Sequence, residues 1–227
     1  MSREELVERY LDGQLSRRVF IRRLVLTGVT TAAALSYASI LEALPADAGV
    51  LTDFYLYVQD FAFFTPAKLA LGQNVQFASG SDAYFHTATD TSGMALFDTG
   101  PIRPRGYGYA TIPTAGSYAY HCSEPTSVHP AMKGKLKAPV VISPPSGNVN
   151  TTFSVTWAVV GLPVGFVVDV QRKAPGGVWT TWQNGVTIGN ASLKLATVGQ
   201  WSFRARLRRI SNGKSSGWSA ATKVNIS

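Results

Sequence analysis

The chain has 227 residues, a formal net charge of +8 and a sequence pI ≈ 9.7. Hydrophobic residues make up 45% and charged residues 15%, a composition that can bury a core and excludes a disordered chain. The single cysteine excludes an intramolecular disulfide framework. Glycine and proline are plentiful, which favours many short strands joined by turns and predicts an all-β protein after a helical N-terminal segment.

The N-terminal residues 1–48 have the pattern of an export signal. Residues 1–15 predict a short amphipathic helix, and Ser16–Arg22 resembles the twin-arginine motif, with paired arginines, an apolar pair and a basic residue. Residues 24–41 are apolar but diluted by glycine, serine and threonine, which is typical of a signal sequence rather than a strong membrane span.

The triplet Ala46-Asp47-Ala48 predicts a cleavage site, so that the mature chain begins near Gly49. A retained membrane anchor and an ordinary soluble helix are the alternatives. With either a cleaved signal or a retained anchor, the protein works outside the cytoplasm, in the periplasm, in the envelope or outside the cell. The leader then contacts a membrane, during export or as the anchor.

Residues 49–138 predict a first domain of short strands separated by glycine and proline turns, typical of a Greek-key sandwich or barrel. The predicted extended segments are 50–60, 68–71, 74–78, 83–89, 95–97, 107–112, 117–122 and 133–139.

Candidate metal ligands gather around the loop after residue 120. That loop holds the only cysteine, Cys122, two of the three histidines and Met132, while His86 lies upstream. Two histidines, a cysteine and a weak methionine form the ligand set that suits type 1 copper, because Cu(I) favours sulfur and Cu(II) tolerates imidazole nitrogen.

The first domain resembles a cupredoxin of the plastocyanin type. The matching segments, in the family's order, are 60–63 with Pro66, 85–89, 97–100, 116–120 and the ligand loop 122–134. The resemblance implies that one copper ion is bound by His86, Cys122, His129 and Met132. It also implies one-electron transfer rather than enzymatic activity, with redox proteins as partners and the imidazole edge of His129 as the exit for the electron.

The loop between Cys122 and His129 departs from that family. It contains six residues, more than is usual there, so Glu124 becomes a competing oxygen ligand and a lost or altered site is the alternative. His121 precedes Cys122 on a strand, so its side chain is expected on the opposite face and outside the ligand set.

Residues 139–227 predict a second domain, an immunoglobulin-like sandwich. A linker at 138–147 merges into a first predicted strand, and the further predicted strands are 151–158, 165–172, 178–182, 192–195, 200–210 and 218–226. Trp157, Trp201–Arg206 and Gly217–Ser219 resemble a fibronectin type III module.

Three arginines of this second domain, Arg204, Arg206 and Arg208, are expected on one face of one strand. Tryptophan rings such as Trp218 or Trp182 are expected to interleave with them by cation–π contacts. Such a row is either a docking face for an envelope glycan or protein, or a surface ladder that only stabilises the sheet.

The sequence therefore predicts an exported electron carrier with a single copper ion. An envelope adhesion or scaffold protein with structural, stored or absent copper is the alternative, and an enzyme with an open copper position is a second one. No paired catalytic carboxylates, Ser-His-Asp set or phosphate loop is recognised, and no nucleic-acid partner is expected.

Overall fold

The structure is a computed structural model in which Leu6, Arg9 and residues 17–26, 54–59, 62–64, 69–124 and 132–227 are described. The chain divides into two units, Met1–Thr52 and Asp53–Ser227. In the first, helix α2 (Arg17–Leu26) begins at the paired arginines. Among the described residues no helix is both long and apolar enough to cross a membrane. The rest of the predicted signal, including the cleavage site, lies outside the described residues.

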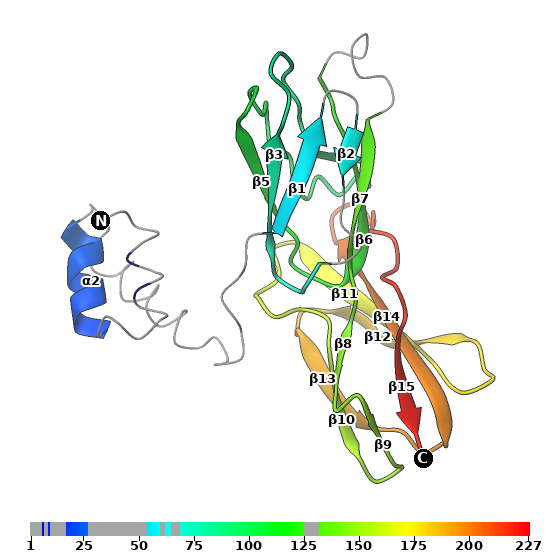
Figure 1. Ribbon diagram of the computed structural model, residues 1–227. Coiled ribbons are helices and arrows are strands. Elements are labelled where there is room, and N and C mark those ends of the chain that lie inside the picture. The colour runs from blue at the N-terminus through cyan, green and yellow to red at the C-terminus, as the bar shows by residue number, and fades with distance from the viewer. Residues whose placement is uncertain are drawn as a thin grey trace. The chain divides into compact units, whose positions relative to one another are not determined.

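The unit Asp53–Ser227 is built of strands, as predicted, and forms two β-sandwiches that follow one another along the chain (Figure 1). One sheet of the first sandwich has the order β2-β1-β3-β5, with β1 and β3 parallel, and the other has the order β4-β6-β7. The strands are β1 (Phe54–Gln59), β2 (Ala62–Phe64), β3 (Asn74–Ser79), β4 (Thr89–Asp90), β5 (Tyr107–Thr111), β6 (Gly116–His121) and β7 (Lys133–Ala138).

The second sandwich pairs a sheet of order β13-β10-β8 with a larger sheet of order β12-β11-β14-β15-β9. Its strands are β8 (Val141–Ser143), β9 (Ser146–Gly147), β10 (Thr152–Thr156), β11 (Phe166–Lys173), β12 (Trp179–Val186), β13 (Asn190–Lys194), β14 (Gly199–Arg209) and β15 (Thr222–Ile226). The predicted boundary after residue 138 falls between β7 and β8. The division into domains 49–138 and 139–227 stays a prediction, since both sandwiches belong to one unit.

Aromatic rings fill the space between the sheets of the first sandwich. Tyr120 of β6 is buried and meets Phe63, Phe77 and Phe97 edge-on or tilted, with ring centroids 4.8, 5.4 and 6.4 Å away. Its ring also occupies the space where a side chain at Gly134 would lie, so β7 can approach β6 only with glycine there. This packing fixes β6, the strand that leads to Cys122.

Two predicted extended segments, 68–71 and 95–97, form no strand, and in a third, 83–89, only Thr89 belongs to one, β4. In the described part of 68–71, Leu69 and Leu71 are buried, but the segment runs as coil and turn, and the Leu69 N–H donates to the Lys137 carbonyl. Residues 95–97 form a loop, because the Asp90 carboxylate accepts the Leu96 N–H at 3.0 Å and Ala95 has a positive φ of 49°.

Backbone hydrogen bonds join the two sandwiches. Ser117, near the start of β6, exchanges N–H···O bonds of 2.9 and 2.8 Å with Gly217, and the Ala115 N–H donates to the Trp157 carbonyl at 2.7 Å. The Tyr118 hydroxyl lies in the same junction, 2.7 Å from Thr114 Oγ1. Burial raises the pKa of Tyr118 far above its ordinary value, so this hydroxyl stays neutral. The first sandwich is therefore fixed to the second by hydrogen bonds that include the main chain.

Candidate functional site

The first predicted ligand, His86, is completely buried and its main chain is fixed on both sides. Its N–H donates to the Ile102 carbonyl at 3.0 Å, and its own carbonyl accepts the Ile102 N–H at 2.6 Å. The chain then runs into β4, whose Thr89 pairs with His121 of β6. The sequence thus brings the segment after His86 alongside the strand that leads to Cys122.

Cys122 directly follows β6, and its sulfur has a defined hydrogen-bond donor. The Thr87 N–H donates to Cys122 Sγ at 3.3 Å, which ties the sulfur to the residue that follows His86. The Cys122 N–H donates in turn to the Met132 carbonyl at 3.2 Å. The cysteine and methionine side chains are 7% and 3% exposed. Three of the four predicted ligands therefore lie on main-chain segments that hydrogen-bond to one another or to the cysteine sulfur.

A cluster of hydroxyl groups braces the same segments. Thr87 Oγ1 accepts the Ser123 N–H at 2.7 Å and lies 2.9 Å from Ser123 Oγ. Thr89 Oγ1 donates to Thr87 Oγ1 at 3.2 Å or to Asp98 Oδ1 at 3.1 Å. Nothing in the sequence indicated this cluster, because its partners lie up to 36 positions apart.

His129 lies outside the described residues, so its predicted role stays a prediction. Among the residues that the structure describes, no three His, Cys, Asp or Glu side chains come together as a metal site. His121 occupies an outward position on β6, where inward residues are buried and outward ones half-buried, in agreement with its exclusion from the ligand set. Glu124 is half-buried and remains a candidate oxygen ligand.

The described donors fit copper by their chemistry. A thiol, an imidazole and a thioether are the soft and intermediate ligands that copper accepts in both oxidation states. The cysteine sulfur receives a main-chain N–H, the kind of interaction that stabilises a thiolate and tunes the potential of a bound metal. Burial of all three side chains keeps water away from them.

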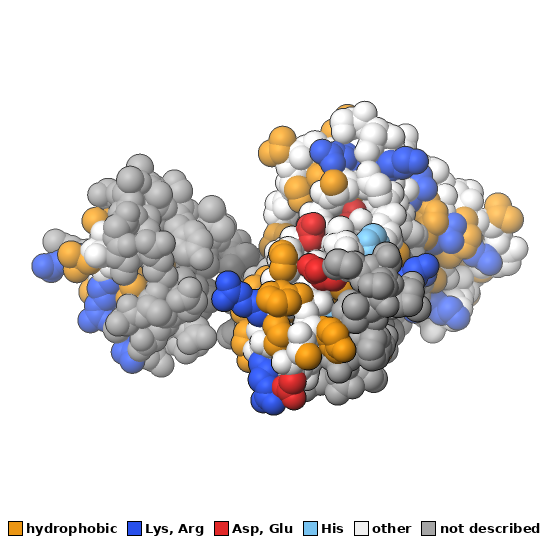
Figure 2. All heavy atoms as spheres, turned by 90° about the horizontal axis from the view of Figure 1, so that it is seen from above, with side chains coloured by type: hydrophobic (Ala, Val, Ile, Leu, Met, Phe, Trp, Pro, Cys, Tyr) orange, Lys and Arg blue, Asp and Glu red, His pale blue; other side chains and the backbone are white. Residues whose placement is uncertain are grey.

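Figure 2 looks onto this end of the first sandwich, where hydrophobic and acidic side chains gather at the surface. Tyr84 and Phe85, which directly precede His86, are 38% and 46% exposed. The acidic residues Asp82 and Asp98 lie in the neighbouring loops. The surface next to the predicted ligands is therefore apolar with acidic neighbours.

The second region singled out in the sequence is the outer side of the larger sheet in the second sandwich. We define its basic face by the cations whose strand positions point outward: Lys173, Arg204, Arg206, Arg208 and Lys223. The Arg204 guanidinium lies between two indole rings, 4.2 Å from the Trp179 centroid and 4.8 Å from the Trp218 centroid. Arg206 lies 4.6 Å from the Trp218 centroid, so the predicted interleaving of arginine and tryptophan is present.

The prediction was wrong about Trp182. Its ring packs inward against Trp157 and Phe203, at centroid distances of 5.9 and 5.5 Å, and Trp179 takes the outward place. Residues three apart on a strand lie on opposite faces, so the alternation along 178–182 already contained the signal that only one of the two rings points outward.

One buried carboxylate holds two of these arginines. Asp169 is 4% exposed and accepts two hydrogen bonds from Arg208 at 3.0 Å, one from Arg206 at 3.1 Å and one from the Gly185 N–H at 3.0 Å. Burial alone opposes ionisation, but the hydrogen bonds from Arg208, Gly185 and Arg206 outweigh it and hold the pKa of Asp169 below its ordinary value.

No protein-family model matches the chain, and no curated protein sequence matches it either. Similar solved structures include a mutant of amicyanin in its reduced Cu(I) form at pH 4, with 21% identity and a TM-score of 0.34, covering 41% of this chain and 87% of that one. A copper-containing nitrite reductase from Thermus scotoductus has 21% identity and a TM-score of 0.31, covering 38% of this chain and 22% of that one. A Fn3-like protein from Clostridium thermocellum has 20% identity and a TM-score of 0.29, and the match covers 39% of this chain and 91% of that one. Similarity at this level does not decide what this chain binds.

The hydroxyl cluster yields a prediction for Thr87. Thr87→Val removes the acceptor of the partly buried Ser123 N–H and is expected to lower the unfolding free energy by about 1 kcal/mol. Thr87→Ser keeps the hydroxyl and is expected to recover most of the loss. Urea unfolding of the metal-free protein measures both. Thr111→Val, which removes an exposed hydroxyl bonded to Asn74 Oδ1, is the matched control and should change little. An equal loss in both valine variants would contradict the assigned role.

Asp169 yields a prediction for pH. Because its folded pKa lies below the unfolded value, its contribution to stability is complete above about pH 4–5 and is lost as the pH falls through the folded pKa. Asp169→Asn is expected to lower the unfolding free energy at pH 7 by about 2 kcal/mol and to flatten its acid dependence. Asp82→Asn removes the exposed partner of Arg105 and serves as control, with almost no effect. Thermal unfolding between pH 3 and 7 checks this, and an unchanged acid dependence in Asp169→Asn would count against it.

Proposed function

We propose that this chain is a copper protein that carries single electrons, with the ion held by His86, Cys122, His129 and Met132. The observation that carries the proposal is the hydrogen bond from the Thr87 N–H to Cys122 Sγ, because it ties the sulfur to the segment of the first histidine. The burial of the histidine, cysteine and methionine together supports it. Copper, when bound, would supply the reversible change between Cu(I) and Cu(II).

The main chain around the proposed ligands is held in place by hydrogen bonds, which suits an electron carrier. The paired backbone bonds between His86 and Ile102, and the ladder between β6 and β7, hold the donors on main chain that is already hydrogen-bonded. A site that is held in this way rearranges little between two oxidation states. The Thr87 N–H lowers the energy of negative charge on the sulfur and thereby influences the reduction potential.

Electron transfer also requires a partner to approach the ligands. The exposed rings of Tyr84 and Phe85 form an apolar surface beside the first histidine, and apolar contact suits a short-lived complex with a redox protein. We therefore place the partner surface at this end of the first sandwich.

The visible spectrum of the copper-loaded full chain tests the function. An intense thiolate-to-copper band that ascorbate bleaches is expected from the wild type. Cys122→Ser is expected to abolish the band and His86→Gln to remove or shift it. His121→Gln is the matched control, because this neighbouring imidazole points away, and it should leave the band unchanged.

Other results would redirect the proposal. A band that persists in Cys122→Ser overturns the ligand assignment. Copper binding without the band or without reversible reduction favours structural or stored copper in an adhesion or scaffold protein. A site that binds azide or peroxide favours an enzyme with an open copper position.

We further propose that the chain is exported through its paired arginines. The motif at Ser16–Arg22, followed by an apolar stretch, supports this. Arg17→Lys together with Arg18→Lys should leave the protein in the cytoplasm of a host with a twin-arginine pathway, whereas Arg22→Lys with Arg23→Lys should not. Fractionation followed by immunoblotting measures the distribution, and export of the first double variant would refute the route.

A further inference from the structure

Positive charge is concentrated in the second sandwich. Residues 49–138 contain six basic and six acidic residues, whereas residues 139–227 contain nine basic residues and only one acidic residue, Asp169. That carboxylate is buried and already bonded to Arg206 and Arg208. The outward charge of the second sandwich is thus almost uncompensated, and nothing in the proposed electron transfer uses it.

The strand register gathers much of this charge on the basic face. Lys173 of β11 and Lys223 of β15 both pair with Ser202 of β14, so the two ammonium groups flank a small residue. Arg204, Arg206 and Arg208 follow at every second position of the same strand, about 7 Å apart. The cations therefore repeat along an extended strip about 20 Å long.

The guanidinium groups of this strip are held in position before any ligand arrives. Arg204 donates through Nε and Nη2 to Gln171 Oε1, at 3.0 and 2.7 Å, while two indole rings enclose it. Arg206 stacks on Trp218 and, among the hydrogen bonds of the described residues, donates only through Nε, which leaves its other N–H groups for an acceptor. A fixed planar fork of N–H donors matches the geometry of a carboxylate.

We propose that the basic face binds an acidic polysaccharide, a chain of sugars that carry carboxylates. Repeated cations on an extended strip fit a polymer of repeated anions. A protein partner would need an apolar anchor in its centre, but both outward indoles, Trp179 and Trp218, already stack against arginine. A membrane surface would need exposed apolar side chains, and the exposed residues of β14 and β15 are all polar or charged.

Polygalacturonate is the probe, and its methyl ester, which has the same backbone without charge, is the control polymer. The full chain should bind polygalacturonate at low salt, lose affinity as salt rises, and not bind the ester.

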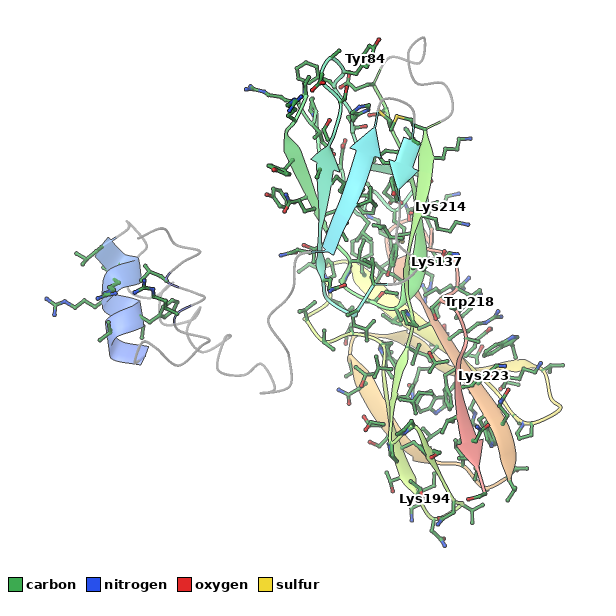
Figure 3. All side chains as sticks on the ribbon, in the orientation of Figure 1. Tyr84, Lys137, Lys194, Lys214, Trp218 and Lys223 are labelled. Carbon is green, nitrogen blue, oxygen red and sulfur yellow. The ribbon has the colours of Figure 1, made fainter. Side chains whose placement is uncertain are left out.

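Lys223→Gln should weaken binding to polygalacturonate about two- to fivefold. Lys194→Gln makes the same chemical change on β13 of the opposite sheet, away from Lys223 and Trp218 in Figure 3, and should leave affinity unchanged. Isothermal titration or surface immobilisation of the polymer measures the affinities.

Two results would overturn the proposal. Equal weakening by Lys223→Gln and Lys194→Gln would show that net charge, and not this face, attracts the polymer. Binding to vesicles that contain anionic lipid, or to an acidic protein, without binding to polygalacturonate would assign the face to another class of partner. Neither result depends on copper, so the outcome stands apart from that of the proposed electron transfer. Thermal unfolding confirms that both variants are folded.

Discussion

The candidate metal centre depends on one hydrogen bond, between the Thr87 N–H and Cys122 Sγ, which joins positions 35 residues apart. A buried N–H without an acceptor costs free energy comparable to a lost hydrogen bond, so the sulfur is a required partner and not an incidental neighbour. The Thr87 hydroxyl secures the following residue, Ser123, from the other side. The cysteine is thus placed by the main chain, and a metal that binds there meets a sulfur whose position is already fixed.

The main pattern of strands could be predicted from the sequence, because alternation reports directly on burial. Phe153, Val155 and Trp157 alternate with polar residues, and all three are completely buried. The same logic placed Arg204 and Arg206 outward and put the end of β6 within one residue of its observed end at His121. Long amphipathic strands and their turns are local properties, so local sequence carries them.

Hydrogen bonds that involve side chains or join distant main-chain segments could not be predicted from the sequence. Residues 95–97 have the apolar composition of a strand, but the Asp90 carboxylate takes the Leu96 N–H and turns the chain into a loop. Leu69 is buried, as a strand residue would be, and its N–H donates to the Lys137 carbonyl of β7, but its own segment forms no strand. The Thr87 and Ser123 cluster is likewise a long-range contact. Such hydrogen bonds join residues that only the complete fold brings together, so a local stretch of sequence cannot predict them.

The junction between the sandwiches connects the two proposals physically. Strand β6 (Gly116–His121) bonds to Gly217 through Ser117 near its start, and Cys122 follows its last residue, five residues and about 17 Å beyond Ser117. Since a hydrogen-bonded strand is stiff over this length, the metal end is held at a set distance from the second sandwich. An acidic polymer would attract the second sandwich, with its excess of basic residues, and not the first, whose charges balance. Attachment through the basic face would therefore leave the surface at Tyr84 and Phe85 accessible to a redox partner, so that immobilisation and electron transfer do not compete for one surface.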